Sequence, residues 1–162
     1  MTRVAINGFG RIGRAVFRII ASREGSGIDV VAINDLSDDD ILAYLLEYDS
    51  VMGRFDHEVT VEDGVMRVDS HEVKMLMEPD PAKLPWDELR VDIVVEATGR
   101  FRDRASLQKH LDAGAKRVIL TVPAKDEIDE TIVLGVNDDR LDAGDLIVSN
   151  ASCTTNCLAP LA

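Results

Sequence analysis

Short apolar runs alternate with a helical pattern along the first part of the chain. Residues 3–6 and 28–34 are mostly apolar, and runs of this length predict strands. Residues 11–22 lie between them and carry apolar side chains at helical spacing, namely Ile12, Ala15, Val16, Ile19 and Ile20. The near-continuous apolar character of residues 28–34 is typical of a parallel sheet covered on both faces. The pattern therefore predicts a strand, an amphipathic helix and a second, parallel strand.

A second helix is predicted after the second strand. Ser37 is the expected N-cap, and the acidic residues 38–40 would occupy the first turn, where the helix dipole favours negative charge. The buried face of this helix would consist of Ile41, Leu42, Leu45 and Leu46. Two helices and two strands in alternation already indicate a layered α/β arrangement.

The rest of the chain continues the alternation. Residues 59–69 alternate around Asp63-Gly64, which predicts a β-hairpin. Further strands are predicted at 71–77, 91–97, 117–122, 131–136 and 146–149, with a short helix near 86–89 and a helix over 103–113 that ends at Gly114. The predicted fold is α/β, with a doubly wound, mostly parallel Rossmann-type sheet and an inserted β-hairpin. Ligands of such sheets bind at the carboxyl ends of the strands.

A glycine-rich turn joins the first predicted strand to the first helix. Gly8, Gly10 and Gly13 of NGFGRIG have the G-x-G-x-x-G spacing, which is weak alone but meaningful between a strand and a helix. In that context Gly8 permits the tight turn, Gly10 the approach of a pyrophosphate, and Gly13 close packing of the helix on the strand. The free N–H groups of Arg11 and Ile12 suit a diphosphate. A plain tight turn is the alternative interpretation.

Asp35 follows the second predicted strand, 22 residues after Gly13. A carboxylate at this position can accept hydrogen bonds from both ribose hydroxyls of NAD, and it would repel the 2′-phosphate of NADP. Residues 24–53 contain no Lys or Arg, and residues 38–40 add negative charge. The sequence therefore favours NAD over NADP. The alternative is that Asp35 only caps a loop.

Cys153 lies in the string SNASCTTNC, just after an apolar run and between Ser152 and Thr154. If a helix starts near Ser152, its dipole favours the thiolate form of Cys153, and the neighbouring hydroxyl groups could bind an oxyanion or a phosphate. A small buried cysteine is an equally weighted alternative. Cys157 lies in the more apolar string CLAPLA and is expected to be structural. Two cysteines alone do not make a metal site, so no metal is expected.

Composition and charge narrow the class of protein. The 162 residues have the size of one domain, and 46% hydrophobic with 4% aromatic residues predict an aliphatic core. A net charge of −12 argues against nucleic acid and anionic membranes as partners. The first residues lack the apolar region of a secretory signal, and no run approaches the ~18 apolar residues of a membrane span. We therefore expect a cytoplasmic protein with free thiols.

Several strings together carry a family resemblance. They occur in this order: NGFGRIGR (7–14), NDL (34–36), YDSVMGRF (48–55), EATGRF (96–101), TVPAK (121–125), GVN (135–137) and SNASCTTNCLAP (149–160). The chain thereby resembles the glyceraldehyde-3-phosphate dehydrogenase family along its whole length, but over only about the first half of that family's length. The resemblance implies an NAD-binding domain at residues 1–149 and the start of a truncated catalytic domain at 150–162.

The same resemblance implies a set of cofactor contacts. Those of the diphosphate fall on Asn7, Gly8, Phe9, Gly10, Arg11 and Ile12, and those of the adenosine half on Asn34, Asp35, Glu78, Thr98, Gly99 and Phe101. Thr121 would point toward the nicotinamide, and Ser152 and Thr154 match phosphate-binding positions. Pro79 stands where the family usually has Arg. Adenine binding would change only if the side chain of that Arg matters.

The resemblance also implies the reaction. Cys153 would be the nucleophile that oxidises and phosphorylates glyceraldehyde 3-phosphate to 1,3-bisphosphoglycerate, with NAD, inorganic phosphate and a cysteine thioester. The family's general-base histidine would lie beyond Ala162, and His57, His71 and His110 do not match it. These residues alone are therefore expected to lack turnover, and the full-length protein to form a homotetramer. The alternatives are erythrose-4-phosphate dehydrogenase, against which Asp35 argues, and a stand-alone NAD-binding module without catalysis.

Overall fold

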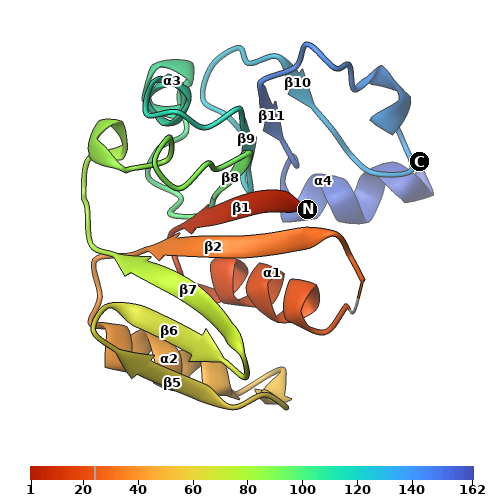
Figure 1. Cartoon of the computed structure of the whole chain (residues 1–162). Coiled ribbons are helices and arrows are strands. Elements are labelled where there is room, and N and C mark those ends of the chain that lie inside the picture. Colours follow the sequence, from red (N-terminus) through yellow and green to blue (C-terminus); the bar gives the residue numbers. More distant parts are fainter. Residues whose placement is uncertain (24) are drawn as a thin grey trace.

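A nine-stranded sheet forms the centre of the computed structural model, which describes residues 1–23 and 25–162 (Figure 1). Its order is β10-β11-β9-β8-β1-β2-β7-β6-β5. The strands are β1 (Thr2–Asn7), β2 (Ile28–Asn34), β5 (Val59–Glu62), β6 (Val65–Val68), β7 (His71–Leu76), β8 (Ile93–Glu96), β9 (Arg117–Leu120), β10 (Glu130–Thr131) and β11 (Ile147–Ser149). Neighbours from β10 to β7 run parallel, whereas β5, β6 and β7 pair antiparallel. The predicted doubly wound sheet with an inserted hairpin is confirmed.

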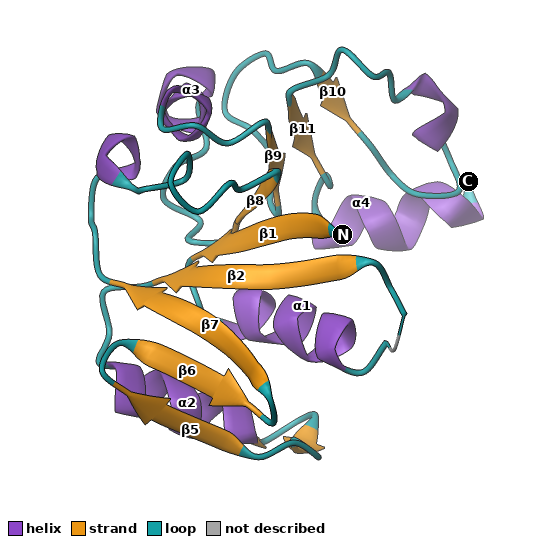
Figure 2. Cartoon of the chain, in the orientation of Figure 1, coloured by secondary structure: helices purple, strands orange, loops and turns teal. Residues whose placement is uncertain are grey.

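Helices cover both faces of this sheet (Figure 2). The helices are α1 (Arg11–Ala21), α2 (Asp39–Glu47), α3 (Arg104–Asp112) and α4 (Cys153–Leu158), with 3-10 turns η1 (Pro81–Lys83), η2 (Asp138–Arg140) and η3 (Ala159–Leu161), and a separate ribbon pairs β3 (Tyr48–Asp49) with β4 (Gly53–Arg54). Helices α1 and α2 share a core with Ile6 of β1, through Phe17 and Leu46. On the other face, Trp86 packs in a cluster with Ala5. Adjacent residues of β1 thus face two separate cores.

The central strands bring three polar residues to one level. Asn7 ends β1 and is in register with Asn34 of β2 on one side and Glu96 of β8 on the other. The chain leaves β1 toward β2 and later returns to place β8 on the opposite side, so β1 and β8 flank the topological switch point. Ligands of open α/β sheets bind outside the carboxyl ends of the strands at this point.

The buried face of α1 differs from the predicted stripe. Gly13 and Phe17 are buried, whereas Ile12 and Ile19 are 49% and 47% exposed. Gly13 lies so close to the preceding turn that no side chain fits, and a Cβ there would be 2.2 Å from the Gly8 carbonyl oxygen. Val16 and Ile20 of the predicted stripe pack against the core as expected, whereas Ile12 and Ile19 lie on the exposed side of the helix.

Helix α2 begins one residue later than predicted. Asp38, not Ser37, is the N-cap, and its carboxylate accepts hydrogen bonds from the N–H groups of Asp40 (3.0 Å) and Ile41 (3.4 Å). Leu42 is buried as predicted, but Ile41 is 55% exposed. Asp38 is the N-cap because its carboxylate reaches the N–H groups of the first turn of the helix.

Two turn predictions are confirmed and two element predictions are wrong. Asp63 and Gly64 both have positive φ, at 51° and 73°, as the tight turn between β5 and β6 requires. Gly114, at φ 107°, follows α3 as predicted. Residues 86–89 form a turn rather than a helix, and only Glu130 and Thr131 of the segment 130–136 pair as a strand.

Candidate functional site

A cavity of about 280 Å³ lies at the carboxyl ends of β1, β2 and β8. It is lined by Asn7, Gly8, Gly10, Asn34, Asp35, Leu36, Glu78, Pro79, Ala97, Thr98, Arg100 and Phe101. This is the place where a doubly wound sheet binds its ligand. The lining comes from four chain segments that are distant in sequence, so it is a property of the fold.

The glycines of the turn allow other backbone segments to pack closely against it and leave room for a ligand. Gly8 has φ +93°, and a Cβ there would be 2.6 Å from the backbone nitrogen of Thr98. A Cβ at Gly10 would have no other residue's atom within 4 Å. Gly8 and Gly13 therefore serve the packing of the turn, whereas Gly10 keeps the surface of the cavity open.

The N-terminus of α1 has the character of an anion-binding site. Gly10 is its N-cap and supplies no side-chain acceptor, and the first turn contains no acidic residue. Among the α-helices in the described part of the chain, the others are capped by side chains, namely Asp38, Asp103 and Ser152. The N–H groups at the start of α1, including those of Arg11 and Ile12, are therefore left for an anionic ligand such as a diphosphate.

Two side chains bind the backbone of Phe9 and hold the turn. The Phe9 N–H donates to Asp35 Oδ2 at 2.7 Å, and its carbonyl accepts from Arg14 Nη1 at 2.8 Å. Burial lowers the pKa of the Arg14 guanidinium, and nearby Asp49 partly opposes this shift. The Phe9 ring is fully buried and packs edge-to-face on Phe17 at 5.8 Å. Phe9 thus faces the interior and shapes the turn from there.

Asp35 lies between the glycine turn and the loop that precedes α2. Its Oδ2 accepts from Phe9, and its Oδ1 accepts from the Ser37 N–H at 3.0 Å. The side chain is only partly buried and lines the cavity. A carboxylate has about four lone-pair positions, so both oxygens retain acceptor capacity for two hydroxyl groups. This geometry fits the ribose of a dinucleotide.

The opposite wall is held by an amide side chain. Asn34 Nδ2 donates to the Glu78 carbonyl at 2.9 Å, and Asn34 Oδ1 accepts from the Glu78 N–H at 2.8 Å. The amide therefore pairs with both backbone groups of Glu78 and fixes the segment that contains Pro79. Both residues of this segment line the cavity.

The predicted site residues fall into two groups. The structure brings Asn7, Gly8, Gly10, Asn34, Asp35, Glu78, Thr98 and Phe101 together around the cavity. Its lining does not include Phe9, Arg11, Ile12, Gly99, Thr121, Ser152, Cys153 and Thr154. Sequence reasoning missed Leu36, Ala97 and Arg100. Leu36 belongs to the string NDL, and Ala97 and Arg100 belong to EATGRF, but their place in the cavity depends on how β2 and β8 end.

Cys153 lies elsewhere, at the start of α4. It is the first residue of the helix and is exposed, as Thr154 and Cys157 are. Ser152 is the N-cap, and its Oγ accepts from the Thr155 N–H at 3.0 Å. Because this hydroxyl is occupied by capping, Thr154 offers the freer hydroxyl beside the thiol. The exposed thiol at a helix start is the geometry expected of a nucleophile.

The turn before α4 is held in an uncommon conformation. Ala151, between β11 and the helix, has φ 56° and is 4% exposed. Its N–H donates to Ser149 Oγ at 3.1 Å, and Asn156 Nδ2 donates to the Asn150 carbonyl at 2.7 Å. A left-handed backbone at a non-glycine residue costs free energy and persists only when its surroundings hold it. Here it directs the chain from the strand into the helix that carries Cys153.

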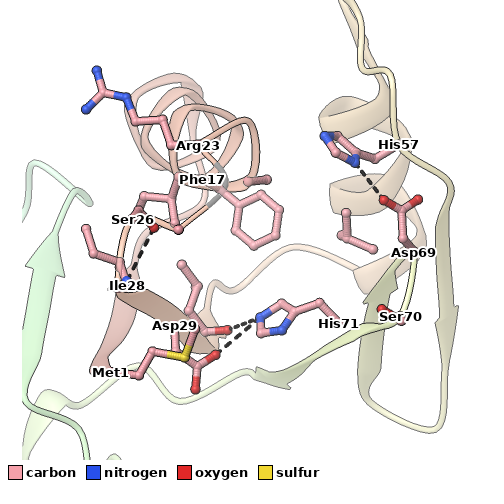
Figure 3. Close-up of a pocket in the computed structure, with 16 residues that line it drawn as sticks. Met1, Phe17, Arg23, Ser26, Ile28, Asp29, His57, Asp69, Ser70 and His71 are labelled. Atoms are coloured by element: carbon pink, nitrogen blue, oxygen red, sulfur yellow. Dashed lines mark hydrogen bonds and ion pairs between the residues drawn. The ribbon is translucent and has the colours of Figure 1, made fainter.

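A second cavity, of about 390 Å³, lies at the amino ends of the parallel strands (Figure 3). Its histidines are already paired. His57 Nδ1 lies 2.7 Å from Asp69 Oδ2, while His71 Nε2 lies 2.9 Å from the Val30 carbonyl and 3.6 Å from Asp29 Oδ1. This end of the sheet is opposite to the glycine turn, so we assign no dinucleotide contact to it.

Within 1–23 and 25–162, no helix is long and apolar enough to cross a membrane. The same ranges contain no group of three or more His, Cys, Asp or Glu side chains arranged to hold a metal ion.

Comparisons with known proteins agree with the geometry. The model of a family described as "Glyceraldehyde 3-phosphate dehydrogenase, NAD binding domain" matches residues 2–104. Over 161 residues, the chain is 55% identical to glyceraldehyde-3-phosphate dehydrogenase of Thermotoga maritima and 56% identical to glyceraldehyde-3-phosphate dehydrogenase 1 of Streptomyces avermitilis. Each match covers 99% of this chain and 48% of the relative. The chain therefore spans about half the length of the curated relatives it matches.

Proposed function

The chain belongs to the glyceraldehyde-3-phosphate dehydrogenase family, and we propose that it supplies the cofactor-binding half and the nucleophilic cysteine of the phosphorylating enzyme. NAD is its cofactor. We place the NAD-binding domain at residues 1–149 and the beginning of the catalytic domain at 150–162. The boundary falls after β11, where the left-handed Ala151 turns the chain into α4.

The observation that carries the proposal is the convergence of three features on one cavity. Gly10 keeps the surface open, the uncapped start of α1 offers N–H groups to a diphosphate, and Asp35 retains acceptors for a ribose. The cofactor would be held by the backbone of the turn, by Asp35 and by the wall around Thr98. Asp35 also supports NAD over NADP, since a 2′-phosphate would meet its negative charge.

In the proposed reaction the substrate is glyceraldehyde 3-phosphate. The Cys153 thiolate adds to the aldehyde carbon and forms a C–S bond, and the carbonyl oxygen takes up a proton, which gives a thiohemiacetal. NAD, when bound, supplies the acceptor for the hydride that leaves this carbon. The hydroxyl proton leaves in the same step to the general base that the family resemblance implies, and a thioester is formed. The thioester on Cys153 is then attacked by inorganic phosphate, which breaks the C–S bond, regenerates the thiolate and releases 1,3-bisphosphoglycerate. The Thr154 hydroxyl lies 3.9 Å from the Cys153 sulfur, and Ser152 and Thr154 are the proposed phosphate-binding groups.

We further propose that the protein acts in the cytoplasm as a homo-oligomer, a tetramer in its full-length form. Exposed apolar side chains on and after α2 support a subunit contact, since Tyr44, Tyr48 and Val51 are 62%, 44% and 88% exposed. The two tyrosine rings lie 5.0 Å apart. Sedimentation velocity of the full-length protein should show a single species larger than the monomer. If the full-length protein is a monomer at micromolar concentration, this part of the proposal is wrong.

Calorimetric titration of the chain with NAD and NADP tests the cofactor assignment. We expect NAD to bind more tightly, and ADP-ribose to retain most of the affinity because the cavity holds Asp35 and the adenosine wall. Tighter binding of NADP, or the absence of binding by both cofactors, would contradict the proposal.

A further inference from the structure

A chain of side-chain hydrogen bonds runs through the interior beneath the cofactor cavity. Trp86 Nε1 donates to His110 Nδ1 at 3.0 Å, and His110 Nε2 lies 3.1 Å from Glu96 Oε2. Asn7 Nδ2 donates to the same Glu96 oxygen at 2.5 Å, and Asn7 Oδ1 accepts from Asn34 Nδ2 at 2.7 Å. Trp86, Glu96 and His110 are fully buried, and both asparagines are nearly so.

The direction of each hydrogen bond in this chain is fixed. An indole N–H can only donate, so His110 Nδ1 must be an acceptor without a proton. The proton of the neutral imidazole is then on Nε2, which donates to Glu96. Asn7 is oriented in the same way, because its oxygen faces the donor Asn34 and its nitrogen faces the carboxylate. Trp86 thus determines which atom His110 presents to Glu96.

Glu96 is the point where these bonds meet. Its Oε2 accepts hydrogen bonds from His110 and Asn7. Its Oε1 accepts hydrogen bonds from the Thr98 N–H, at 2.8 Å, and from the Thr98 hydroxyl. No Lys or Arg forms an ion pair with Glu96 among the residues that the structure describes. The buried carboxylate is therefore satisfied by four hydrogen-bond donors, as a buried anion requires in the absence of a cation.

Each oxygen of Glu96 orients one wall of the cavity. Through Oε1 it holds Thr98, whose hydroxyl in turn accepts from the Arg100 N–H at 3.1 Å, and this turn forms the wall of residues 97–101. Through Oε2 it orients Asn7 and hence Asn34, which binds both backbone groups of Glu78 on the opposite wall. Glu96 itself does not line the cavity.

We propose that Glu96 is a positioning residue for NAD, and that its carboxylate, oriented by His110 and Trp86, sets both walls of the adenosine side of the cofactor cavity. The inference rests on the proposed placement of adenosine in this cavity. It assigns a role in cofactor binding to three buried residues that do not line the cofactor cavity.

The amide variant Glu96→Gln tests the carboxylate while keeping its shape. A glutamine places an NH₂ group on one side, where it meets either the Thr98 N–H or the His110 N–H, and neither donor can turn away. We expect NAD and ADP-ribose affinity to fall about tenfold or more in calorimetry, because a hydrogen bond to a charged group is replaced by a clash of donors. Glu72→Gln, an exposed glutamate on β7, is the matched control and should bind as wild type does.

A second pair of variants keeps the test decisive if Glu96→Gln does not fold. Thr98→Val removes the hydroxyl at nearly constant shape, and Thr98→Ser retains it. We expect Thr98→Val to bind NAD about fivefold more weakly than Thr98→Ser, as for the loss of one hydrogen bond, so the comparison is made between these two variants. Hydrogen exchange at the Thr98 amide should be slow in the wild type and faster in folded Glu96→Gln.

The outcomes separate the inference from the proposed function. Wild-type affinity in folded Glu96→Gln, or equal affinities of Thr98→Val and Thr98→Ser, would overturn the positioning role alone. Failure of the wild-type chain to bind NAD would contradict the cofactor assignment and the positioning role together. The expected result is weaker binding by Glu96→Gln than by the control Glu72→Gln, and weaker binding by Thr98→Val than by Thr98→Ser.

Discussion

The carboxylate of Asp35 and the backbone N–H of Phe9 are joined by a hydrogen bond of 2.7 Å, which ties the end of β2 to the turn after β1. The same carboxylate is the proposed ribose acceptor. One side chain therefore has two roles, and its removal affects both the shape of the turn and the recognition of the ligand.

Replacing Asp35 should change cofactor preference. We expect Asp35→Ala to weaken NAD binding by about 1.5–3 kcal/mol, through loss of charge-assisted hydrogen bonds, and to narrow the difference between NAD and NADP because the repulsion of the 2′-phosphate disappears. Calorimetry with both cofactors measures this. The control Asp40→Asn removes one nearby charge outside the cavity and should leave the preference almost intact. An unchanged ratio in Asp35→Ala would refute the assignment.

Substitutions at Gly13 and Gly10 should affect folding and NAD binding differently. Gly13→Ala is expected to prevent native folding, since its Cβ would lie 2.2 Å from the Gly8 carbonyl oxygen. Gly10→Ala should fold, with a loss of stability of at most about 1 kcal/mol at the N-cap, but bind NAD at least about tenfold more weakly. Thermal melts and titrations on both variants give the comparison. Tight NAD binding by Gly10→Ala would show that the diphosphate lies elsewhere.

Arg18 should be important for the stability of the α2 segment. Its buried guanidinium donates to the carbonyls of Leu46, Glu47 and Gly53, and it lies 5.1 Å from the Phe55 ring. We expect Arg18→Met to cost about 2–4 kcal/mol in urea unfolding, because buried carbonyls lose their donors.

The control for this prediction is a substitution at an exposed arginine. Arg23→Met should change stability by less than about 0.5 kcal/mol. Arg18→Lys should lie between the two, since an ammonium lacks the planar fork that reaches several carbonyls at once. Equal effects at both positions would contradict the role assigned to Arg18.

Asp129 should contribute to acid sensitivity. Burial tends to raise its pKa, but the N–H groups of Ile147 and Leu146 and the side chain of Arg104, 2.7 Å away, lower the pKa overall. A carboxyl whose folded pKa lies below the unfolded value of about 3.9 stabilises the fold above that value, and this contribution is lost as the pH falls through the folded pKa. The urea midpoint should therefore drop more steeply below about pH 4 in wild type than in Asp129→Asn. If the urea midpoint falls equally steeply with pH in wild type and in Asp129→Asn, Asp129 does not contribute to acid sensitivity.

The turn at Ala151 should control the reactivity of Cys153. Ala151→Val places a β-branched residue at φ 56°, which is expected to cost about 1–2 kcal/mol and to displace the start of α4. Alkylation by iodoacetamide, followed by mass spectrometry, should show a lower rate at Cys153 relative to Cys157. Ala151→Gly relieves the backbone strain and should keep the wild-type ratio. A ratio that is insensitive to Ala151→Val would mean that the turn does not direct the thiol.

Local signals in the sequence were sufficient where one short segment determines its own conformation. Asp63-Gly64 predicted the hairpin because both residues accept positive φ, and the spacing of Gly8 and Gly13 predicted the turn and the close helix. The strand prediction for residues 131–136 was wrong because backbone groups of this segment form hydrogen bonds outside the sheet. Asn137 accepts from the Val133 N–H at 2.7 Å, so the strand ends after two residues.

The candidate site was predictable only in part, for a physical reason. Asp35 could be recognised because its distance from the glycine turn is characteristic of the fold. The contacts among Trp86, Glu96 and His110 join residues from a turn, a strand and a helix, and no spacing or periodicity indicates that their polar atoms meet. Buried networks of this kind become visible only when tertiary structure brings their members together.

The ends of the sheet have a consequence for how copies of this protein can meet. The outermost strands, β5 and β10, contain four and two residues. A long unpaired outer strand would offer a row of free N–H and C=O groups to another chain, whereas strands this short offer very few. The hairpin thereby protects β7, which would otherwise be exposed to such pairing. Addition of a strand from another chain to either of these two edges is therefore disfavoured.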